Sequence, residues 1–231
     1  MSGQDRYWVE YYESLSKTGP QWLDYSNERV HLQTFGTVIE IADRLIGRRV
    51  LDIGCGRGLL CRMAHVLGAA SVTGVDIVEA EMQKLAEANP EITWRAGDVT
   101  DATFRSSLGR FDAAYLLEVM QYLPVPQMFD WLWEMLDPGG MIVAVFPFED
   151  CPIVKRTVAR FDGRYVPPPM AEIAAWAKRI PDLESWAVRG MHFQEDQRIA
   201  PYALTPWTQE ATWPVAPNRI QLVIKKGLLA R

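Results

Sequence analysis

The feature that most limits the fold of this chain is an alternation of short apolar runs and amphipathic stretches between residues 49 and 146. Strand-like runs lie at 49–53, 71–77, 91–97, 111–119 and 141–146, and helical patterns lie between them at 57–68, 78–90, 101–109 and 126–136. This alternation predicts an α/β fold, a mostly parallel sheet with helices on both faces. Right-handed crossovers bring the carboxyl ends of the strands to one edge, where ligands of such sheets bind.

The flanking segments predict two further parts of a single structural domain. Aromatic residues at helical spacing predict a helix over 4–17, and a second apolar face predicts a helix over 28–46, so residues 1–47 should form an N-terminal helical cap. Residues 48–147 should form the ligand-binding core. Residues 148–231 should form a substrate-facing insertion and the last strands, with a proline-rich loop at 201–217 between strand patterns.

Composition excludes several classes of protein. The formal net charge is -5 and the basic residues are scattered, which argues against a nucleic-acid partner. Three cysteines without CxxC spacing favour a reducing compartment and argue against a disulfide framework or a zinc site. No apolar run approaches the ~20 residues of a membrane span, and the first residues lack a secretory signal pattern. We therefore expect a soluble cytoplasmic protein with no membrane partner.

Three glycines follow the first predicted strand in VLDIGCGRG, residues 50–58. A dinucleotide-binding turn would have GxGxxG, and here the third glycine comes one position early. Asp52 places a carboxylate beside the turn, which disfavours a pyrophosphate and favours a ligand with an ammonium group. Asp76 ends the second strand, where a carboxylate can accept hydrogen bonds from both ribose hydroxyls. Asp98 ends the third strand, within reach of an adenine amino group.

Five segments in this order resemble the class I S-adenosylmethionine-dependent methyltransferases of the stand-alone, small-molecule type. They are VLDIGCGRG, GVDI, AGDVT, FDAAYLLEVMQYLP and LDPGGMIVAVFP. The resemblance implies a Rossmann-like, doubly wound, mostly parallel seven-stranded sheet with an antiparallel last strand near 218–227, and an N-terminal helical lid.

The same resemblance implies S-adenosylmethionine as the cofactor, S-adenosylhomocysteine as its product, and no metal. The cofactor-binding residues that it implies are Asp52, Gly54, Cys55, Gly56, Asp76, Ile77, Asp98, Val99 and Leu117, with Tyr11 and Tyr12 on the lid. Asp52 would support the amino group of the cofactor, Asp76 its ribose and Asp98 its adenine.

The segment after the fourth predicted strand indicates which class of acceptor the resemblance favours. It lacks the Asn-or-Asp-Pro-Pro-aromatic run of enzymes that methylate nucleic-acid bases. It resembles the EVLEHLP of small-molecule enzymes, except that Gln121 and Tyr122 replace Glu and His, which argues against a histidine base or a metal at that segment. Glu118, Tyr122 and His31 are the catalytic candidates, and their alternative roles are a helix cap, aromatic packing and a surface histidine respectively.

The resemblance implies methyl transfer to a hydroxyl or amino group of a small-molecule acceptor, in a biosynthetic role. Aromatic residues between 148 and 217 suit a pocket for such an acceptor. Two alternatives remain open: an acceptor that is a protein or is bound to a carrier, and a module that binds the cofactor without catalysis. An open, polar-lined pocket would favour an enzyme over the last of these.

Overall fold

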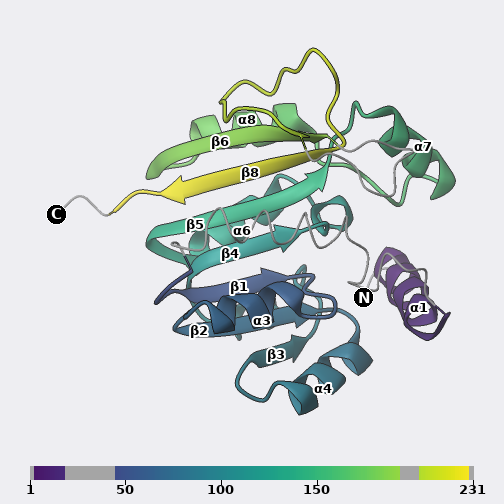
Figure 1. The fold of residues 1–231 in the computed structure, drawn as a ribbon, viewed down its shortest axis with the longest axis vertical. Helices are drawn as coiled ribbons and strands as arrows, with labels where there is room; N and C mark the ends of the chain where they lie inside the picture. The colour runs from purple at the N-terminus through teal and green to yellow at the C-terminus, as the bar shows by residue number, and fades with distance from the viewer. Residues whose placement is uncertain (1–2, 19–44, 193–202, 229–231) are drawn as a thin grey trace. The chain divides into compact units, whose positions relative to one another are not determined.

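The described residues of the chain, 3–18, 45–192 and 203–228, form two compact units in this computed structural model (Figure 1). Unit 1 comprises residues 3–18 and 45–107, and unit 2 comprises residues 108–192 and 203–228. The division at 107/108 falls inside the range 48–147 that the sequence assigns to one core, and the three-part division remains a prediction. His31 and nearly all of the helix expected over 28–46 lie outside the described residues.

Unit 1 contains three parallel strands in the order β3-β2-β1. Its elements are α1 (Gly3–Thr18), β1 (Arg49–Ile53), α3 (Leu59–Val66), β2 (Ser71–Asp76), α4 (Glu79–Ala88), β3 (Thr93–Ala96) and α5 (Ala102–Ser106). In register, Asp52 pairs with Gly74 and Asp76 pairs with Ala96. The four residues of β1 from Val50 to Ile53 are all buried, as expected for a central parallel strand.

Unit 2 contains five strands in the order β4-β5-β8-β6-β7. Its elements are β4 (Phe111–Leu117), η2 (Met120–Tyr122), α6 (Gln127–Met135), β5 (Leu136–Pro147), α7 (Pro152–Arg160), α8 (Met170–Arg179), β6 (Leu183–His192), β7 (Ala203–Leu204) and β8 (Arg219–Lys226). Strand β4 is parallel to β5, and β8 is antiparallel to both β5 and β6. The described residues thus contain eight strands where seven were predicted. The additional one is the two-residue β7, in the segment expected to be loop.

Helices α6 and α8 lie beside the strands of this unit (Figure 1), and they pack on each other through aromatic side chains. The Trp176 ring lies 4.9 Å from the Phe129 ring and 5.6 Å from the Trp133 ring, between centroids. The Trp176 indole N–H also donates to Asp130 at 2.7 Å. Phe129 and Trp176 are almost fully buried, so they form the apolar centre of this layer.

The segment before β8 covers the outer edge of β6. Strand β7 pairs with Met191 and His192, and Thr208 exchanges both backbone hydrogen bonds with Val188. A Cβ on Gly190 would lie 2.9 Å from Pro217, so the covering chain approaches closely. An exposed strand edge can pair with another chain, and this segment removes that hazard.

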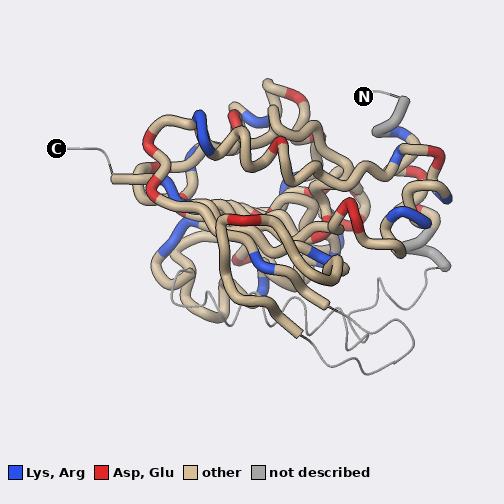
Figure 2. Tube along the Cα trace, turned by 90° about the horizontal axis from the view of Figure 1, so that it is seen from above, with Lys and Arg blue, Asp and Glu red and all other residues tan. Residues whose placement is uncertain are grey.

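Charged side chains of both signs are interspersed along the described trace (Figure 2). Within that part of the chain, no helix combines the length and the apolar character that crossing a bilayer takes.

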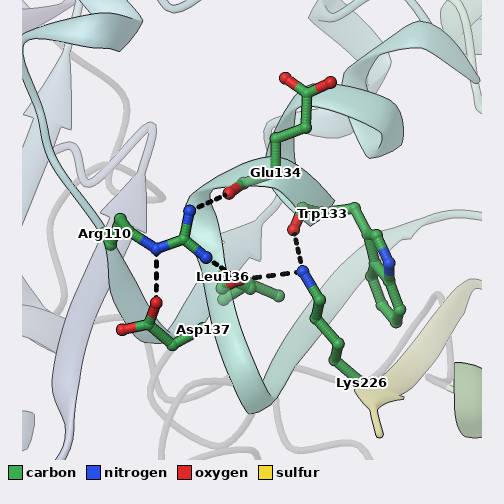
Figure 3. A network of polar contacts seen from close by, with 6 residues as sticks. All are labelled: Arg110, Trp133, Glu134, Leu136, Asp137 and Lys226. Atoms are coloured by element: carbon green, nitrogen blue, oxygen red, sulfur yellow. Dashed lines mark hydrogen bonds and ion pairs between the residues drawn. The ribbon is translucent and has the colours of Figure 1, made fainter. Parts of the chain in front are cut away.

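Two cations bind the carbonyl groups at the end of α6 (Figure 3). Arg110 pairs with Asp137 and donates to the carbonyls of Glu134 and Leu136, both at 2.9 Å. The Lys226 ammonium donates to the carbonyls of Trp133 at 2.7 Å and Leu136 at 3.0 Å. Since the last carbonyls of a helix have no partner within the helix, these contacts satisfy them and favour the positive charges at that end.

We expect Lys226→Met to lower the free energy of unfolding by about 1–3 kcal/mol, because two carbonyl groups lose a charged donor. Lys225→Met is the matched control, because the Lys225 side chain lies on the face of β8 opposite to that of Lys226. We expect this substitution to change the free energy of unfolding by less than about 0.5 kcal/mol. Urea denaturation of the two variants checks this. Equal losses would show that the Lys226 contacts do not stabilise the fold.

Candidate active site

The glycine-rich loop of unit 1 is held by β2. The backbone N–H groups of Gly54 and Cys55 donate to the Val75 carbonyl at 2.8 and 3.0 Å, which continues the pairing of β1 and β2 into the loop. Gly54 and Gly56 have φ of 68° and 52°, a backbone conformation that glycine adopts without strain. The loop therefore turns directly beside the last residue of β2, Asp76.

Asp76 is bound by two backbone donors. The Gly56 N–H donates to its Oδ2 at 2.9 Å and the Val78 N–H donates to its Oδ1 at 3.0 Å. Burial raises the pKa of this carboxyl, and the bonds from Val78 and Gly56 oppose that increase. Each carboxylate oxygen can accept a second hydrogen bond, so the group is fixed in place and retains capacity for two further donors.

Asp52 is 2% exposed and accepts a hydrogen bond from the Cys61 thiol, with 3.2 Å between Sγ and Oδ2. Burial raises the pKa of Asp52 to about 7, the bond from Cys61 lowers it, and the charge of Asp76 raises it. Burial also raises the pKa of Cys61, which keeps that thiol protonated as a donor. Asp52 is thus a buried carboxyl that exchanges its proton near neutral pH.

The remaining predicted cofactor residues of unit 1 make contacts with residues close to them in the sequence or are buried. Asp98 accepts hydrogen bonds on Oδ1 from the backbone N–H and the hydroxyl of Thr100, at 2.8 and 2.7 Å. Cys55 and Val99 are buried, and Ile77 is half-buried after β2. On α1, the Tyr11 ring lies 5.4 Å from the Tyr12 ring and 5.6 Å from the Trp8 ring, so the two tyrosines belong to an aromatic cluster.

The third glycine of the loop has a packing role that the sequence analysis missed. A Cβ on Gly58 would lie 2.3 Å from the Trp94 ring, and a Cβ on Gly74 would lie 2.7 Å from the same ring. The Trp94 indole is fixed further by donating to the Asn89 carbonyl at 3.0 Å. The early position of this glycine in the motif therefore accommodates a tryptophan from β3.

Unit 2 places the catalytic candidate Glu118 directly after β4, whose last residue is the predicted cofactor residue Leu117. Glu118 has φ of 59°, a left-handed conformation that is uncommon for a residue with a side chain. Its N–H donates to the Val145 carbonyl at 2.8 Å, and its carbonyl accepts from the Gln121 side chain at 2.6 Å. Such strained residues occur often at functional sites.

The Glu118 carboxylate pairs with Arg219, which the sequence analysis did not select. The Arg219 Nε–H donates to Glu118 Oε1 at 2.5 Å, and a second N–H of this guanidinium donates to the Asn218 carbonyl at 3.0 Å. Arg219 is the first residue of β8, so the antiparallel strand brings its start to the edge where β4 ends. A charged residue directly before a mostly buried strand segment was the available signal.

Tyr122 and Tyr165 complete this polar and aromatic cluster of unit 2. Their rings meet edge to face at 5.9 Å, and the Tyr165 ring stacks on Phe161 at 6.2 Å. The backbone N–H of Val166 donates to the Gln121 carbonyl at 3.1 Å, which ties the Tyr165 segment to η2. We call Glu118, Tyr122, Tyr165 and Arg219 the Glu118 cluster.

Among the described residues, no group of three or more His, Cys, Asp and Glu side chains could hold a metal ion. The site features are thus a glycine loop with a fixed carboxylate in unit 1 and an ion pair beside two tyrosines in unit 2.

Comparison with known proteins identifies the family. A family model described as a methyltransferase domain matches residues 50–140. The fold is that of NodS, an N-methyltransferase from Bradyrhizobium japonicum solved with S-adenosylhomocysteine, with a TM-score of 0.64 at 18% identity over 93% of this chain and 97% of that one. Residues 50–140 are a methyltransferase domain. The curated relatives and the solved structures support a class I S-adenosylmethionine-dependent methyltransferase, and the predicted Rossmann-like α/β fold is confirmed.

Curated relatives of the methyltransferase carry the name ubiquinone biosynthesis O-methyltransferase. The protein from Bordetella bronchiseptica is 28% identical over 78% of this chain and 83% of its own length. The one from Maricaulis maris is 36% identical over 50% of this chain and 44% of its own length, so the chain spans about half of some relatives. Magnesium protoporphyrin IX methyltransferase from Synechocystis shares the fold at 19% identity, with a TM-score of 0.63 over 98% of this chain and 99% of that one.

Proposed function

We propose that this methyltransferase transfers a methyl group from S-adenosylmethionine to a hydroxyl oxygen of a small-molecule acceptor. The observation that carries the proposal is Asp76, a carboxylate fixed by the N–H groups of Gly56 and Val78 with one free acceptor position on each oxygen. Two such positions suit the two adjacent hydroxyls of a ribose. The curated relatives, which are named O-methyltransferases, favour oxygen over nitrogen as the methylated atom.

Residues of unit 1 would hold the cofactor. Asp76 would accept hydrogen bonds from the ribose hydroxyls, and Asp52 would pair with the amino group. The loop residues Gly54, Cys55 and Gly56 would contact the methionine part. Adjacent positions after β2 and β3 would contact the adenine, namely Ile77, Asp98 and Val99. The aromatic face of α1 with Tyr11 and Tyr12, and Leu117 in unit 2, would complete the set.

When bound, S-adenosylmethionine supplies a methyl group activated by a positively charged sulfur. The task of the protein is then to hold the acceptor oxygen in line with that methyl group and to remove its proton. In unit 2, the Glu118 carboxylate would accept the hydroxyl proton as the O–CH3 bond forms. Methyl transfer would then leave S-adenosylhomocysteine, a methyl ether and a protonated Glu118 carboxyl.

Two measurements test the proposed function. The first is isothermal titration calorimetry with S-adenosylhomocysteine, for which we expect micromolar affinity. The second is incubation with S-adenosylmethionine and a panel of hydroxylated and aminated compounds, analysed by mass spectrometry for the addition of one CH2. Absence of binding at millimolar S-adenosylhomocysteine overturns the proposal, and binding without methylation of any compound favours a non-catalytic module. Methylation of amines alone would show that the acceptor atom is nitrogen.

The buried Asp52 predicts a pH dependence of cofactor binding. Its pKa of about 7 means that this carboxyl is mostly protonated at pH 6 and mostly ionised at pH 8. An ammonium group favours the ionised form, so we expect S-adenosylhomocysteine to bind roughly tenfold more tightly at pH 8 than at pH 6. Binding at pH 7 should also release a proton, because the ligand lowers the pKa of Asp52.

Calorimetry in buffers of different ionisation enthalpy measures that proton directly. Asp52→Asn should bind more weakly and with less pH dependence, while Asp76, the other carboxylate that affects Asp52, stays in place. An affinity that rises equally with pH in the wild type and in Asp52→Asn would assign the titration to another group.

A further inference from the structure

The Glu118 cluster contains a hydroxyl group that its local hydrogen bonds do not use. Tyr165 is 7% exposed, and its ring is fixed between Tyr122 at 5.9 Å and Phe161 at 6.2 Å. Its hydroxyl makes no hydrogen bond to any residue in the described parts of the chain. The hydroxyl oxygen keeps access to solvent although the ring is buried, so a ligand can reach it from outside and hydrogen-bond to it.

Charges next to this hydroxyl determine what it can do. Burial raises the pKa of Tyr165, and the negative charge of Glu118 raises it further. The positive charge of Arg219 lowers this pKa, and Tyr122 raises it. The phenol therefore keeps its proton and can donate a hydrogen bond near the Glu118 carboxylate. A donor and a carboxylate acceptor in one cluster match the two sides of a neutral hydroxyl group, which both accepts and donates.

Arg219 has a different position in the cluster. Two N–H groups of its guanidinium donate to Glu118 Oε1 and to the Asn218 carbonyl. The backbone of Arg219 pairs with both β5 and β6. The guanidinium is thus anchored at the start of a central strand and restricts the Glu118 carboxylate to one orientation. The other Glu118 oxygen can still accept a proton or a hydrogen bond.

We propose that Tyr165 binds the acceptor by donating a hydrogen bond to its hydroxyl oxygen, and that Arg219 is a positioning residue for Glu118, which takes the proton of that hydroxyl. This inference rests on the proposed function and specifies how the acceptor is recognised. It assigns roles to Tyr165, from the loop after α7, and to Arg219, from strand β8. The substrate class that follows is a neutral hydroxyl compound.

The test uses 4-fluorophenol and fluorobenzene as probes, which differ in one hydroxyl group and are both observed by fluorine NMR. The full chain is saturated with S-adenosylhomocysteine, and the affinities of the two probes are compared. We expect the wild type to prefer 4-fluorophenol by about tenfold or more, since a site that hydrogen-bonds a hydroxyl rejects the analogue that lacks it. Tyr165→Phe should reduce that preference to about twofold.

Arg219→Met should reduce the preference to a similar extent, and Arg219→Lys should restore part of it because the charge opposite Glu118 returns. A merely structural role of Arg219 would give equal losses in both variants. The affinity for S-adenosylhomocysteine and the thermal midpoint are measured on each protein, so that an unfolded variant is recognised; Tyr165→Phe, which removes one oxygen atom, keeps the test valid if both Arg219 variants fail to fold.

Three outcomes overturn the inference: no preference for 4-fluorophenol in the wild type, no binding of either probe, or an unchanged preference in Tyr165→Phe. Failure of the proposed function has a separate signature, which is absence of S-adenosylhomocysteine binding by the wild type.

Discussion

Replacing Asp76 with alanine is expected to weaken the binding of S-adenosylhomocysteine by at least about 100-fold. The proposed ribose contact consists of two hydrogen bonds to an ionised group, each worth about 1.5–3 kcal/mol. Their sum corresponds to a factor of about 100 or more in the dissociation constant. The substitution also removes the partner of the Gly56 N–H, which leaves the loop less ordered. Both effects act in the same direction, and calorimetry measures their sum.

Asp101 offers a matched control in the same unit. Its carboxylate also accepts two backbone N–H groups, from Thr103 at 2.7 Å and Phe104 at 3.1 Å, at the start of α5. Asp101→Ala removes a helix cap and should lower the stability of the fold slightly, with less than about a twofold effect on binding. If Asp76→Ala and Asp101→Ala weaken binding equally, the effect of Asp76 is a general loss of order and the ribose assignment is wrong.

Gly58→Ala is expected to lower the free energy of unfolding by about 2–5 kcal/mol. A residue with a side chain at φ of 69° costs about 1–2 kcal/mol, and forcing a Cβ to 2.3 Å from the Trp94 ring adds the cost of overpacking, about 1–3 kcal/mol. The ring cannot move away easily, since Gly74 contacts the same ring and the indole N–H is bonded to Asn89. Chemical denaturation measures the loss.

Gly47→Ala separates the two contributions. Gly47 has φ of 71° in the same unit, and a Cβ there would meet no atom within 4 Å, so only the backbone cost of about 1–2 kcal/mol should appear. Combining Gly58→Ala with Trp94→Leu should recover about 1–3 kcal/mol relative to the sum of the single effects. Equal losses in Gly47→Ala and Gly58→Ala, or strict additivity of the pair, would contradict the steric explanation.

The succession of strands along the chain and the carboxylates at their ends could be predicted because both depend on local patterns. Each acidic residue lies within two positions of the end of an apolar run, so finding the strand also locates the carboxylate. Asp76 is the last residue of β2, and Asp98 follows β3 closely. The hydrogen bonds of Asp76 are short in sequence as well, since its partners lie within the adjacent loop and turn.

The Glu118 cluster could be predicted only in part, because its members meet through the sheet topology. Arg219 and Glu118 are 101 residues apart and meet because β8 runs antiparallel beside β5. Periodicity identifies a strand over 218–227 but does not determine its neighbours. Tyr165 lies in the segment between α7 and α8, which has no regular secondary structure. In such a segment no periodic sequence pattern indicates the direction of a side chain.

The roles of the glycines show the limit of motif reasoning. The sequence presents Gly54, Gly56 and Gly58 as one motif, and the resemblance implies that Gly54 and Gly56 contact the cofactor. The structure divides them, because the space above Gly58 is filled by the Trp94 ring from β3. The glycine motif alone does not predict a contact with a side chain from another strand.

The position of β8 between β5 and β6 has a consequence for synthesis of the protein. Strands β5 and β6 leave the ribosome first, and each keeps a row of unpaired backbone groups until residues 219–226 have been made. Nascent chains stalled before that point would offer two open edges for aggregation or for a chaperone. Since Arg219 is part of the same strand, the Glu118 cluster would also be complete only after this late step of synthesis.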